Sequence, residues 1–383
     1  MDVQPFQVHL DQATLDDLRD RLGRSRWPDT ILGSAWDYGA DLAYMQELTA
    51  YWQTEFDWRA QERAISTFAH FRATIDGLGI HFVHARGSGP NPLPLIITHG
   101  WPGSFVELLS IIPLLADPAA DGGDPADSFD VVVPSLPGYG FSDRPTQPGM
   151  HAARIADLWA RLMRGLGYRR FGAQGGDWGA SVASFLGLTY PQQIAGIHLN
   201  YIPGSFRPYL APDAILSEAE QTFRTEREHW YQTEGGYGHI QATKPQTLAY
   251  GLNDSPAGLA AWIVEKFRAW SDCGGDVERR FSKDELLTNI TIYWATQTIH
   301  SSTRLYYESL KRPLQFGPGE RILAPCGVAF FPKEVPAPPR EWVERVYNVR
   351  RWTEMPRGGH FAAMEEPALL AEDIRAFFRP LRD

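Results

Sequence analysis

A chain of 383 residues is long enough for one large domain with insertions, or for two domains that share a core. The formal net charge of −10 and the lack of a Lys/Arg block argue against nucleic acid as a partner and favour small neutral ligands. The two cysteines, Cys273 and Cys326, lack metal-ligand spacing, so the sequence indicates neither a disulfide framework nor a metal site and fits a reducing, cytoplasmic compartment.

The first 92 residues are predicted to form an N-terminal arm. Apolar spacing and strand-like alternation predict two helices followed by two antiparallel strands, over residues 12–25, 40–54, 68–75 and 80–85. Asp76-Gly77 supplies the turn between the two strands. The sequence contains no secretory segment and no run of about 18 apolar residues, so no membrane anchor is expected.

At residue 93 the pattern changes to apolar strand, short loop and helix. Strands are predicted over 93–100, 129–138, 169–177 and 194–200, with helices between them over 105–116, 152–167 and 178–191. This alternation predicts an α/β fold with a mostly parallel, doubly wound sheet. Ligands of such sheets bind at the carboxyl ends of the strands.

The alternation stops near Pro203. Residues 206–315 are predicted to be helix and loop, with clear helices over 258–270 and 285–310, before strands resume over 323–331 and 349–355 and a last helix follows. A helical insertion between strands is expected to form a lid. The predicted organisation is an N-terminal arm wrapping the core (1–92), a first core part (93–205), a helical lid (206–318) and a second core part (319–383).

The stretch GAQGGDWGA, residues 172–180, has the outline of a nucleophile elbow, the tight strand-to-helix turn that presents a serine in many hydrolases. Here the residue at the apex is Asp177. A carboxylate has an ordinary pKa of about 3.9 and attacks without a base to deprotonate it. Attack on a saturated carbon, of an epoxide or an alkyl halide, gives an ester that water can cleave later. Asp177 is therefore the predicted nucleophile; the structural alternative is a helix N-cap.

Cleavage of that ester requires a base. His360, after the last predicted strand, is the expected base, because it follows the nucleophile in chain order as in hydrolases of this architecture. Glu334, after the preceding strand, is the expected acid that orients the imidazole and stabilises the imidazolium. The alternatives are that Glu334 belongs to a solvated loop and that Glu341 or Glu344 takes its place.

Two backbone N–H groups are expected to form an oxyanion hole. The stretch HGWPG, residues 99–103, follows the first parallel strand and brings the N–H of Trp101 towards that of Trp178, the residue after the nucleophile. Loss of one such donor lowers a hydrolytic rate by about 10²–10³. The side chains of both tryptophans are expected to be core aromatics that also line the substrate pocket.

Together with these residues, five stretches resemble the microsomal-type branch of the epoxide hydrolase family, in the α/β-hydrolase superfamily. They are HGWPGSFVELL, PSLPGYGFSD, GGDWGA, the lid stretch GYGHIQATKPQTLAYGLNDSPAGLAAWIVEKF and RGGHFAAMEEP. The resemblance covers nearly the whole chain and implies the α/β-hydrolase fold and a cofactor-independent conversion of an epoxide to a vicinal diol. It places nucleophile, acid and base on Asp177, Glu334 and His360. Because the sequence has no apolar N-terminal anchor, it resembles the soluble microbial members.

The resemblance also implies two lid tyrosines that hydrogen-bond the epoxide oxygen. They fall on Tyr237 and Tyr306, with the adjacent Tyr307 left open as the second donor. A phenol with an ordinary pKa of about 10 stays protonated until it donates to the alkoxide of the opened ring. A departing halide needs no such proton.

The expected substrate is a hydrophobic epoxide, with an aryl-bearing one as a candidate, because the lid is rich in aromatic residues, including Trp262, Trp270 and Trp294. The expected role of the protein is detoxification or a step of natural-product biosynthesis. The rival functions are a haloalkane dehalogenase and a catalytically silent small-molecule-binding hydrolase fold. The expected partners are the epoxide and water, without metal or cofactor; the oligomeric state is open, with a homodimer as one candidate.

Overall fold

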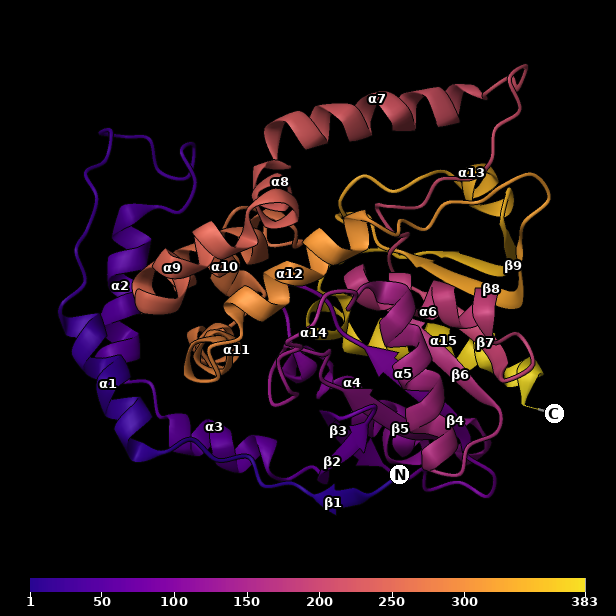
Figure 1. Cartoon of the computed structure of the whole chain (residues 1–383), viewed down its shortest axis with the longest axis horizontal. Helices are drawn as coiled ribbons and strands as arrows, with labels where there is room; N and C mark the ends of the chain where they lie inside the picture. Colours follow the sequence, from indigo (N-terminus) through magenta and orange to yellow (C-terminus); the bar gives the residue numbers. More distant parts are fainter. Residues whose placement is uncertain (383) are drawn as a thin grey trace.

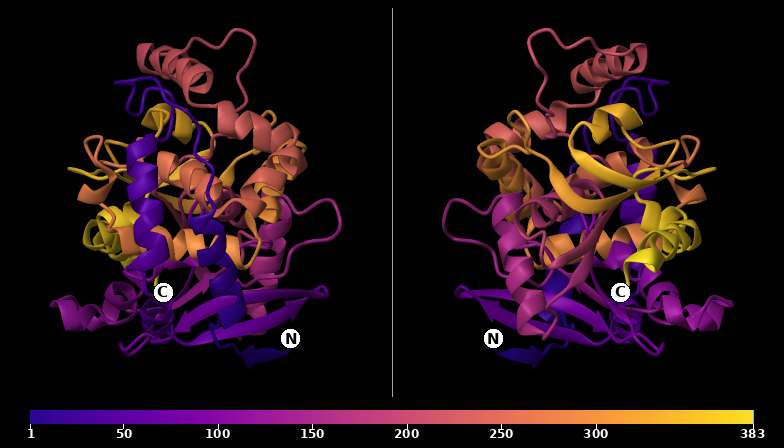
Figure 2. Two further views of the ribbon diagram at one scale, coloured as in Figure 1. Left: turned by 90° about the vertical axis from the view of Figure 1, so that its left-hand side faces the viewer. Right: turned by 90° about the vertical axis from the view of Figure 1, so that its right-hand side faces the viewer.

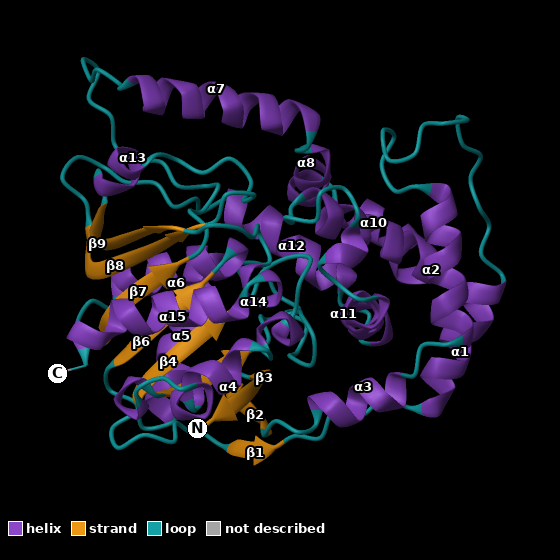
Figure 3. Cartoon of the chain, turned by 180° about the vertical axis from the view of Figure 1, so that it is seen from behind, coloured by secondary structure: helices purple, strands orange, loops and turns teal. Residues whose placement is uncertain are grey.

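Within residues 1–382, which the computed structural model describes, nine strands form one sheet in the order β1-β2-β3-β5-β4-β6-β7-β8-β9 (Figure 3). The strands are β1 Val3–Pro5, β2 His70–Ile75, β3 Leu78–Ala85, β4 Leu93–Thr98, β5 Phe129–Pro134, β6 Phe171–Gly175, β7 Ile194–Leu199, β8 Ile322–Phe330 and β9 Tyr347–Glu354. Strands β1, β2, β3 and β5 pair antiparallel in that order, and all later pairs are parallel. The predicted mostly parallel sheet is confirmed, as is the antiparallel pair before it.

Helices cover both faces of the sheet. Alternate residues of β7 point to opposite faces, so they contact different helices. On one face, Ile197 packs closely against α6 (Asp177–Thr189), since a Cβ added at Gly187 of that helix would lie 3.2 Å from Ile197. On the other face, Nε2 of His198 lies 3.0 Å from Oδ2 of Asp373 in α15 (Pro367–Phe378). Helix α5 (Ala152–Gly165) packs beside α6, and α4 (Ile111–Ala116) packs beside α15 (Figure 1). The short helices α13 (Arg340–Glu344) and α14 (Ala362–Glu365) connect β8, β9 and α15.

Six helices are inserted between β7 and β8. They are α7 Glu218–Thr233, α8 Gly236–Thr243, α9 Pro245–Asp254, α10 Pro256–Ala269, α11 Lys283–Ala295 and α12 Ile299–Leu310. The prediction of one helix over 285–310 was wrong, because the backbone reverses at Gln297, whose φ is 53°. The hydroxyl of Thr296 donates to the carbonyl of Ile292 at 2.6 Å and caps α11. The break lets α12 run across the view of Figure 1 while α11 is seen end on.

The N-terminal helices lie against these inserted helices. Helices α1 (Gln12–Gly23) and α2 (Leu42–Thr54) contact α10 and α11, and α3 (Trp58–Ile65) contacts α11. The views of Figure 2 show the indigo segment beside the orange one. Helix α1 buries Leu15, Leu18 and Leu22, as its apolar spacing predicts. The ring N–H of Trp52 in α2 donates to Thr291 in α11 at 3.0 Å. The chain start therefore supports the inserted helices as well as the sheet edge.

The predicted helix over 105–116 is two shorter elements. Residues Phe105–Leu108 form a 3₁₀ turn, and α4 begins only at Ile111. Helix α3 and strand β1 were not predicted, because both are short. In residues 1–382 none of the helices has the length and apolar character needed to cross a bilayer.

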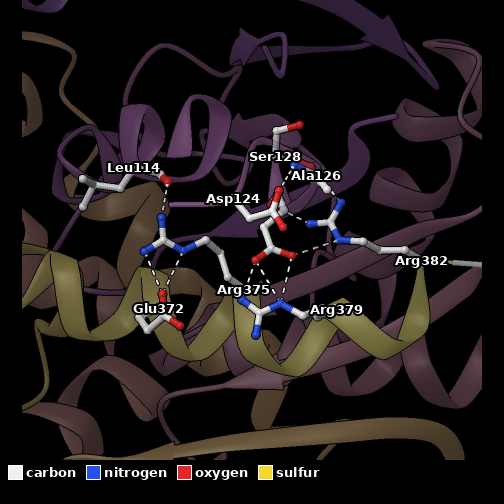
Figure 4. A network of polar contacts seen from close by, with 9 residues as sticks. Leu114, Asp124, Ala126, Ser128, Glu372, Arg375, Arg379 and Arg382 are labelled. Carbon is white, nitrogen blue, oxygen red and sulfur yellow. Dashed lines mark hydrogen bonds and ion pairs between the residues drawn. The ribbon is translucent and has the colours of Figure 1, made fainter. Parts of the chain in front are cut away.

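A buried carboxylate ties the last helix to the loop before β5 (Figure 4). The Asp127 side chain is buried, and its Oδ2 accepts from Nε of Arg379 at 3.0 Å. Arg382 donates to the carbonyl of Ser128 at 2.9 Å, one residue further along the same loop. Charge-assisted bonds of this kind are stronger than neutral ones, so they fix the end of α15 on the sheet.

Candidate active site

The turn between β6 and α6 holds Asp177 in a strained backbone conformation. Its φ is 45°, in the left-handed region that residues other than glycine rarely adopt. The turn also brings backbones into contact: a Cβ at Gly179 would lie 1.9 Å from the carbonyl oxygen of Thr98, and one at Gly175 would lie 2.2 Å from the backbone of Gly179. Glycine is thus required on both sides of the apex, which explains the Gly-x-Asp-x-Gly frame.

The Asp177 carboxylate faces a backbone donor and a histidine. Its Oδ1 accepts from the N–H of Trp101 at 2.8 Å, and its Oδ2 lies 3.5 Å from Nε2 of His360. Within residues 1–382 no hydrogen bond links the N–H of Trp178 to the resting carboxylate, so its share in an oxyanion hole stays a prediction. Oδ1 is therefore the oxygen held by the backbone, and Oδ2 is the freer one.

The loop that carries Trp101 is fixed from two sides. Within the core, Nε2 of His99 accepts from the N–H of Leu136 at 3.1 Å, so its Nδ1 carries the proton and donates to the carbonyl of Gly100 at 3.0 Å. From α11, Asn289 donates to the carbonyl of Pro102 at 2.8 Å, and Tyr293 donates to that of Gly103 at 2.7 Å. These contacts hold the Trp101 N–H in place before any substrate arrives.

His360 and Glu334 form a buried pair. Nδ1 of His360 lies 2.6 Å from Oε1 of Glu334, whose position is fixed by the N–H of Val335 at 2.8 Å. The rival carboxylates are engaged elsewhere: Glu341 accepts from Ser217 at 2.7 Å, and Glu344 accepts from Arg340. The structure therefore brings Glu334, and not its alternatives, to the histidine.

The charge state of His360 depends on its two carboxylate neighbours. Burial alone would lower the pKa of the imidazole, because it penalises the charged form. The negative charges of Glu334 and Asp177 outweigh burial and raise the pKa of His360 well above its ordinary value. Both carboxylates therefore favour the imidazolium form of His360 in the resting site.

Two tyrosines from the inserted helices meet above Asp177. Tyr237 in α8 stacks on the ring of Trp101, with centroids 5.3 Å apart, and Tyr306 in α12 lies edge-on to Trp178 at 4.8 Å. Burial raises the pKa of both phenols well above the ordinary value, and the charge of Asp177 adds to it, so both stay protonated. Tyr307 is 40% exposed, with the Lys311 ammonium over its ring, and lines a different cleft.

A cavity of about 790 Å³ opens between Asp177 and the inserted helices. Its aromatic lining includes Trp178, Trp230, Tyr237, Trp270 and Tyr306. Of the two tryptophans expected to line the substrate pocket, Trp178 does so, whereas Trp101 borders a separate, smaller cavity.

The three lid tryptophans named from the sequence also lie in different surroundings. Trp270 lines the large cavity, and its ring centroid lies 5.1 Å from that of His360. The ring N–H of Trp262 donates to Gln241 at 3.0 Å, and Trp294 borders a cleft beside α1. Of the three lid tryptophans expected from the sequence to favour an aromatic substrate, only Trp270 therefore lines the large cavity.

The smaller cavity, of about 20 Å³, borders Asp177 and has room for one water molecule. Polar groups of Glu107, Gln174, Asp177, Asn200 and His360 border it. Burial raises the pKa of Glu107 to about 8, while the nearby imidazolium and carboxylate of the site act in opposite directions. At neutral pH this carboxyl group is therefore protonated and able to donate a hydrogen bond.

Glu107, Gln174 and Asn200 were not singled out from the sequence. Glu107 is the one charged residue in FVELLSIIPLLA, residues 105–116, and this isolation in an apolar stretch is a signal that could have identified it. Gln174 and Asn200 lie at the carboxyl ends of β6 and β7, and the amide of Gln174 donates to Asn200 at 2.7 Å. Both positions are where parallel sheets bind ligands.

This fold and this arrangement define an α/β hydrolase. The family model described as alpha/beta hydrolase fold matches residues 94–254, and the model described as Epoxide hydrolase N terminus matches residues 3–108. Epoxide hydrolase 1 of Oryctolagus cuniculus is 39% identical over 98% of this chain and 88% of its own. The chain belongs to the epoxide hydrolase family, and its activity is the hydrolysis of epoxides.

Solved structures show the same relationship. The juvenile hormone epoxide hydrolase of the silkworm Bombyx mori aligns with a TM-score of 0.84 and 31% identity, over 100% of this chain and 94% of the other. The epoxide hydrolase of Aspergillus niger aligns with a TM-score of 0.86 and 30% identity, over 100% of this chain and 97% of the other. The predicted fold class and family are thereby confirmed.

Proposed function

We propose that this epoxide hydrolase works in two steps through an ester on Asp177. In the first step, Oδ2 of Asp177 bonds to an epoxide carbon as the ring carbon–oxygen bond breaks, and the electron pair moves onto the ring oxygen. That oxygen takes a proton from the pair Tyr237 and Tyr306, which face Asp177 across the large cavity. Both phenols are protonated beforehand, so they act as donors.

Formation of the ester prepares the base for the second step. Esterification removes the negative charge of Asp177, one of the two charges that raise the pKa of His360. The pKa of the imidazole then falls, and the proton it releases balances the one that the tyrosines supplied. A neutral His360, held by Glu334 at 2.6 Å, accepts a proton from water.

The hydrolytic water occupies the small cavity that borders Asp177. Its polar border, with protonated Glu107 as donor and the imidazole of His360 as acceptor, suits one water molecule. The water attacks the ester carbonyl, and the oxyanion on Oδ1 is held by the N–H groups of Trp101 and Trp178. As the tetrahedral intermediate collapses, His360 gives the proton taken from water to the departing alkoxide oxygen, which completes the diol. The Asp177 carboxyl group, which now contains the oxygen of water, then returns its own proton to His360.

The proposed substrate is a hydrophobic epoxide with an aryl group. The aromatic side chains of the large cavity, among them Trp178 and Trp270, offer ring faces and edges for such a group. The helices α7 to α12 act as the lid that closes this cavity, with boundaries at residues 206–318, and residues 1–92 act as the arm that supports it.

The observation that carries this proposal is the approach of His360 Nε2 to Asp177 Oδ2 at 3.5 Å. The test uses the variant His360→Gln, which keeps the nucleophile and removes the base. After incubation with styrene oxide, peptide mass spectrometry should find the substrate mass retained on Asp177. Turnover at the wild-type rate, or an unmodified peptide together with lost turnover, would contradict the proposed roles.

Two further measurements test the rival functions, haloalkane dehalogenation and binding without catalysis. Release of halide from a chloroalkane or bromoalkane, without turnover of styrene oxide, would contradict the donor role of the tyrosines, because a halide needs no proton. Binding of epoxides without any adduct would contradict the nucleophilic role of Asp177.

A further inference from the structure

A buried ammonium group lies beside the active site. Lys266 in α10 is 6% exposed, although lysine side chains are rarely buried. Its Nζ lies 4.9 Å from the ring centroid of Tyr237 and 5.7 Å from that of Trp270. Burial of a cation costs free energy that a Leu or Met at this position avoids, so the placement calls for a use of the charge.

The ion pair of Lys266 does not account for this placement. Nζ lies 2.6 Å from Oε2 of Glu265, its neighbour in the same helix, whose side chain is more exposed. An ion pair of adjacent residues needs no buried aromatic partner and forms equally well at the helix surface. The feature specific to this site is the ammonium over the ring of Tyr237.

The position of the cation matches the charge that develops on Tyr237. When the hydroxyl gives its proton to the opening epoxide, the ring gains negative charge, and a cation over its face stabilises that state more than the neutral phenol. Burial opposes the same change, and the charges of Asp177 and Glu265 add to that opposition. In a buried site these electrostatic effects are stronger than in water.

We propose that Lys266 is a positioning residue that accelerates epoxide opening by holding its ammonium over the ring of the proton donor Tyr237. The inference rests on the proposed role of Tyr237. The Asp177 oxygen–carbon bond forms, the ring carbon–oxygen bond breaks, and the proton of Tyr237 moves to the product oxygen. Lys266 takes no part in the proton transfer and stabilises the phenolate through space. Ester hydrolysis, in which Tyr237 takes no part, is unaffected.

Single-turnover kinetics with styrene oxide separates the two steps. Rapid quenching of excess enzyme, followed by mass spectrometry of the intact protein, gives the rate of ester formation and the rate of its hydrolysis. Lys266→Met, which keeps length and apolar bulk, is expected to slow ester formation about tenfold, with hydrolysis within about twofold of wild type. Lys266→Arg keeps a cation and is expected to retain most of the rate.

Two further variants distinguish charge from structure. In a Tyr237→Phe background the Lys266→Met change is expected to have no further effect on ester formation, because the cation acts through the phenol. Glu265→Gln breaks the ion pair but keeps the ammonium, so it is expected not to slow ester formation. A loss in Glu265→Gln equal to that in Lys266→Met would overturn the proposal, as would equal slowing of both steps. If Lys266→Met does not fold, Lys266→Gln takes its place.

The same variants distinguish the role of Lys266 from the donor role of Tyr237. Ester formation at the wild-type rate in Tyr237→Phe would contradict the donor role of Tyr237 itself. A slow Tyr237→Phe variant together with a wild-type rate in Lys266→Met would overturn the role of Lys266 alone.

Discussion

Nε2 of His360 lies 3.5 Å from Oδ2 of Asp177, so the proposed base and the proposed nucleophile form one ion pair in the resting enzyme. Through this pair, the charge of Asp177 controls the protonation of His360 and so the order of the two proposed steps. As long as Asp177 is charged, it helps to raise the pKa of the imidazole and keeps the base protonated. In the proposed mechanism, only the ester, which has no charge, frees His360 to accept a proton. The proposed base would therefore be active only when there is an ester to hydrolyse.

The two tyrosines are expected to act mainly in the first step. Replacing either Tyr237 or Tyr306 with Phe should slow ester formation by about 10²-fold, because the alkoxide loses a proton donor. Rapid-quench measurement of the ester on Asp177 checks this. Tyr307→Phe is the matched control and should react at the wild-type rate, since Tyr307 lines a different cleft. Equal losses in all three variants would contradict the assignment.

Glu107 is expected to make stability depend on pH. Its pKa is raised to about 8 in the folded protein from an ordinary 4.5, so the folded state binds more protons than the unfolded state between these values. Its contribution is fully present below about pH 4.5 and is lost as the pH rises through about 8. Relative to Glu107→Gln, the wild-type free energy of unfolding should fall by about 5 kcal/mol over this range. Urea unfolding of both proteins at several pH values measures the difference, and parallel curves would contradict it.

The same residue is expected to position the hydrolytic water. Glu107→Gln keeps a hydrogen-bond donor and should hydrolyse the ester at near the wild-type rate at neutral pH. Glu107→Leu removes the donor and should slow ester hydrolysis about tenfold or more while ester formation is retained. Rapid-quench decay of the ester measures both. Loss of hydrolysis in the Gln variant alone would show that the acidic proton itself is needed.

Glycine at position 179 is expected to be required for folding. In Gly179→Ala the new Cβ would meet the Thr98 carbonyl at 1.9 Å, so the variant should lose at least about 3 kcal/mol of stability or fail to fold. The control is Gly251→Ala in α9, where no atom lies within 4 Å of the new Cβ. It should stabilise the protein by about 0.5–1 kcal/mol. Thermal unfolding compares the two, and a stable Gly179→Ala variant would contradict the close packing of the elbow.

The fold was predictable where one local pattern determined the structure. Apolar strands alternating with helices gave the parallel sheet, and the Gly-x-Asp-x-Gly frame placed Asp177 at the strand-to-helix turn. The break at Gln297 was not predictable in this way, because both flanking segments have good helical sequences. Only the packing of α12 over the site requires the chain to turn there.

The polar residues of the site were harder to predict from the sequence. Glu107 follows the loop of Trp101 but reads as part of an apolar helix, and its raised pKa comes from burial that only the tertiary structure creates. Lys266 similarly reads as a polar position of α10, and its contact with Tyr237 joins two helices. Spacing along the chain carries no information on such contacts between elements.

The central claim is that an Asp177 oxygen bonds to the substrate carbon before water enters the product. A single turnover in water enriched in ¹⁸O, with enzyme in excess over epoxide, tests it directly. The account predicts an unlabelled diol and ¹⁸O in the peptide that contains Asp177. A labelled diol and an unlabelled peptide would show that water attacks the epoxide itself and would contradict the account.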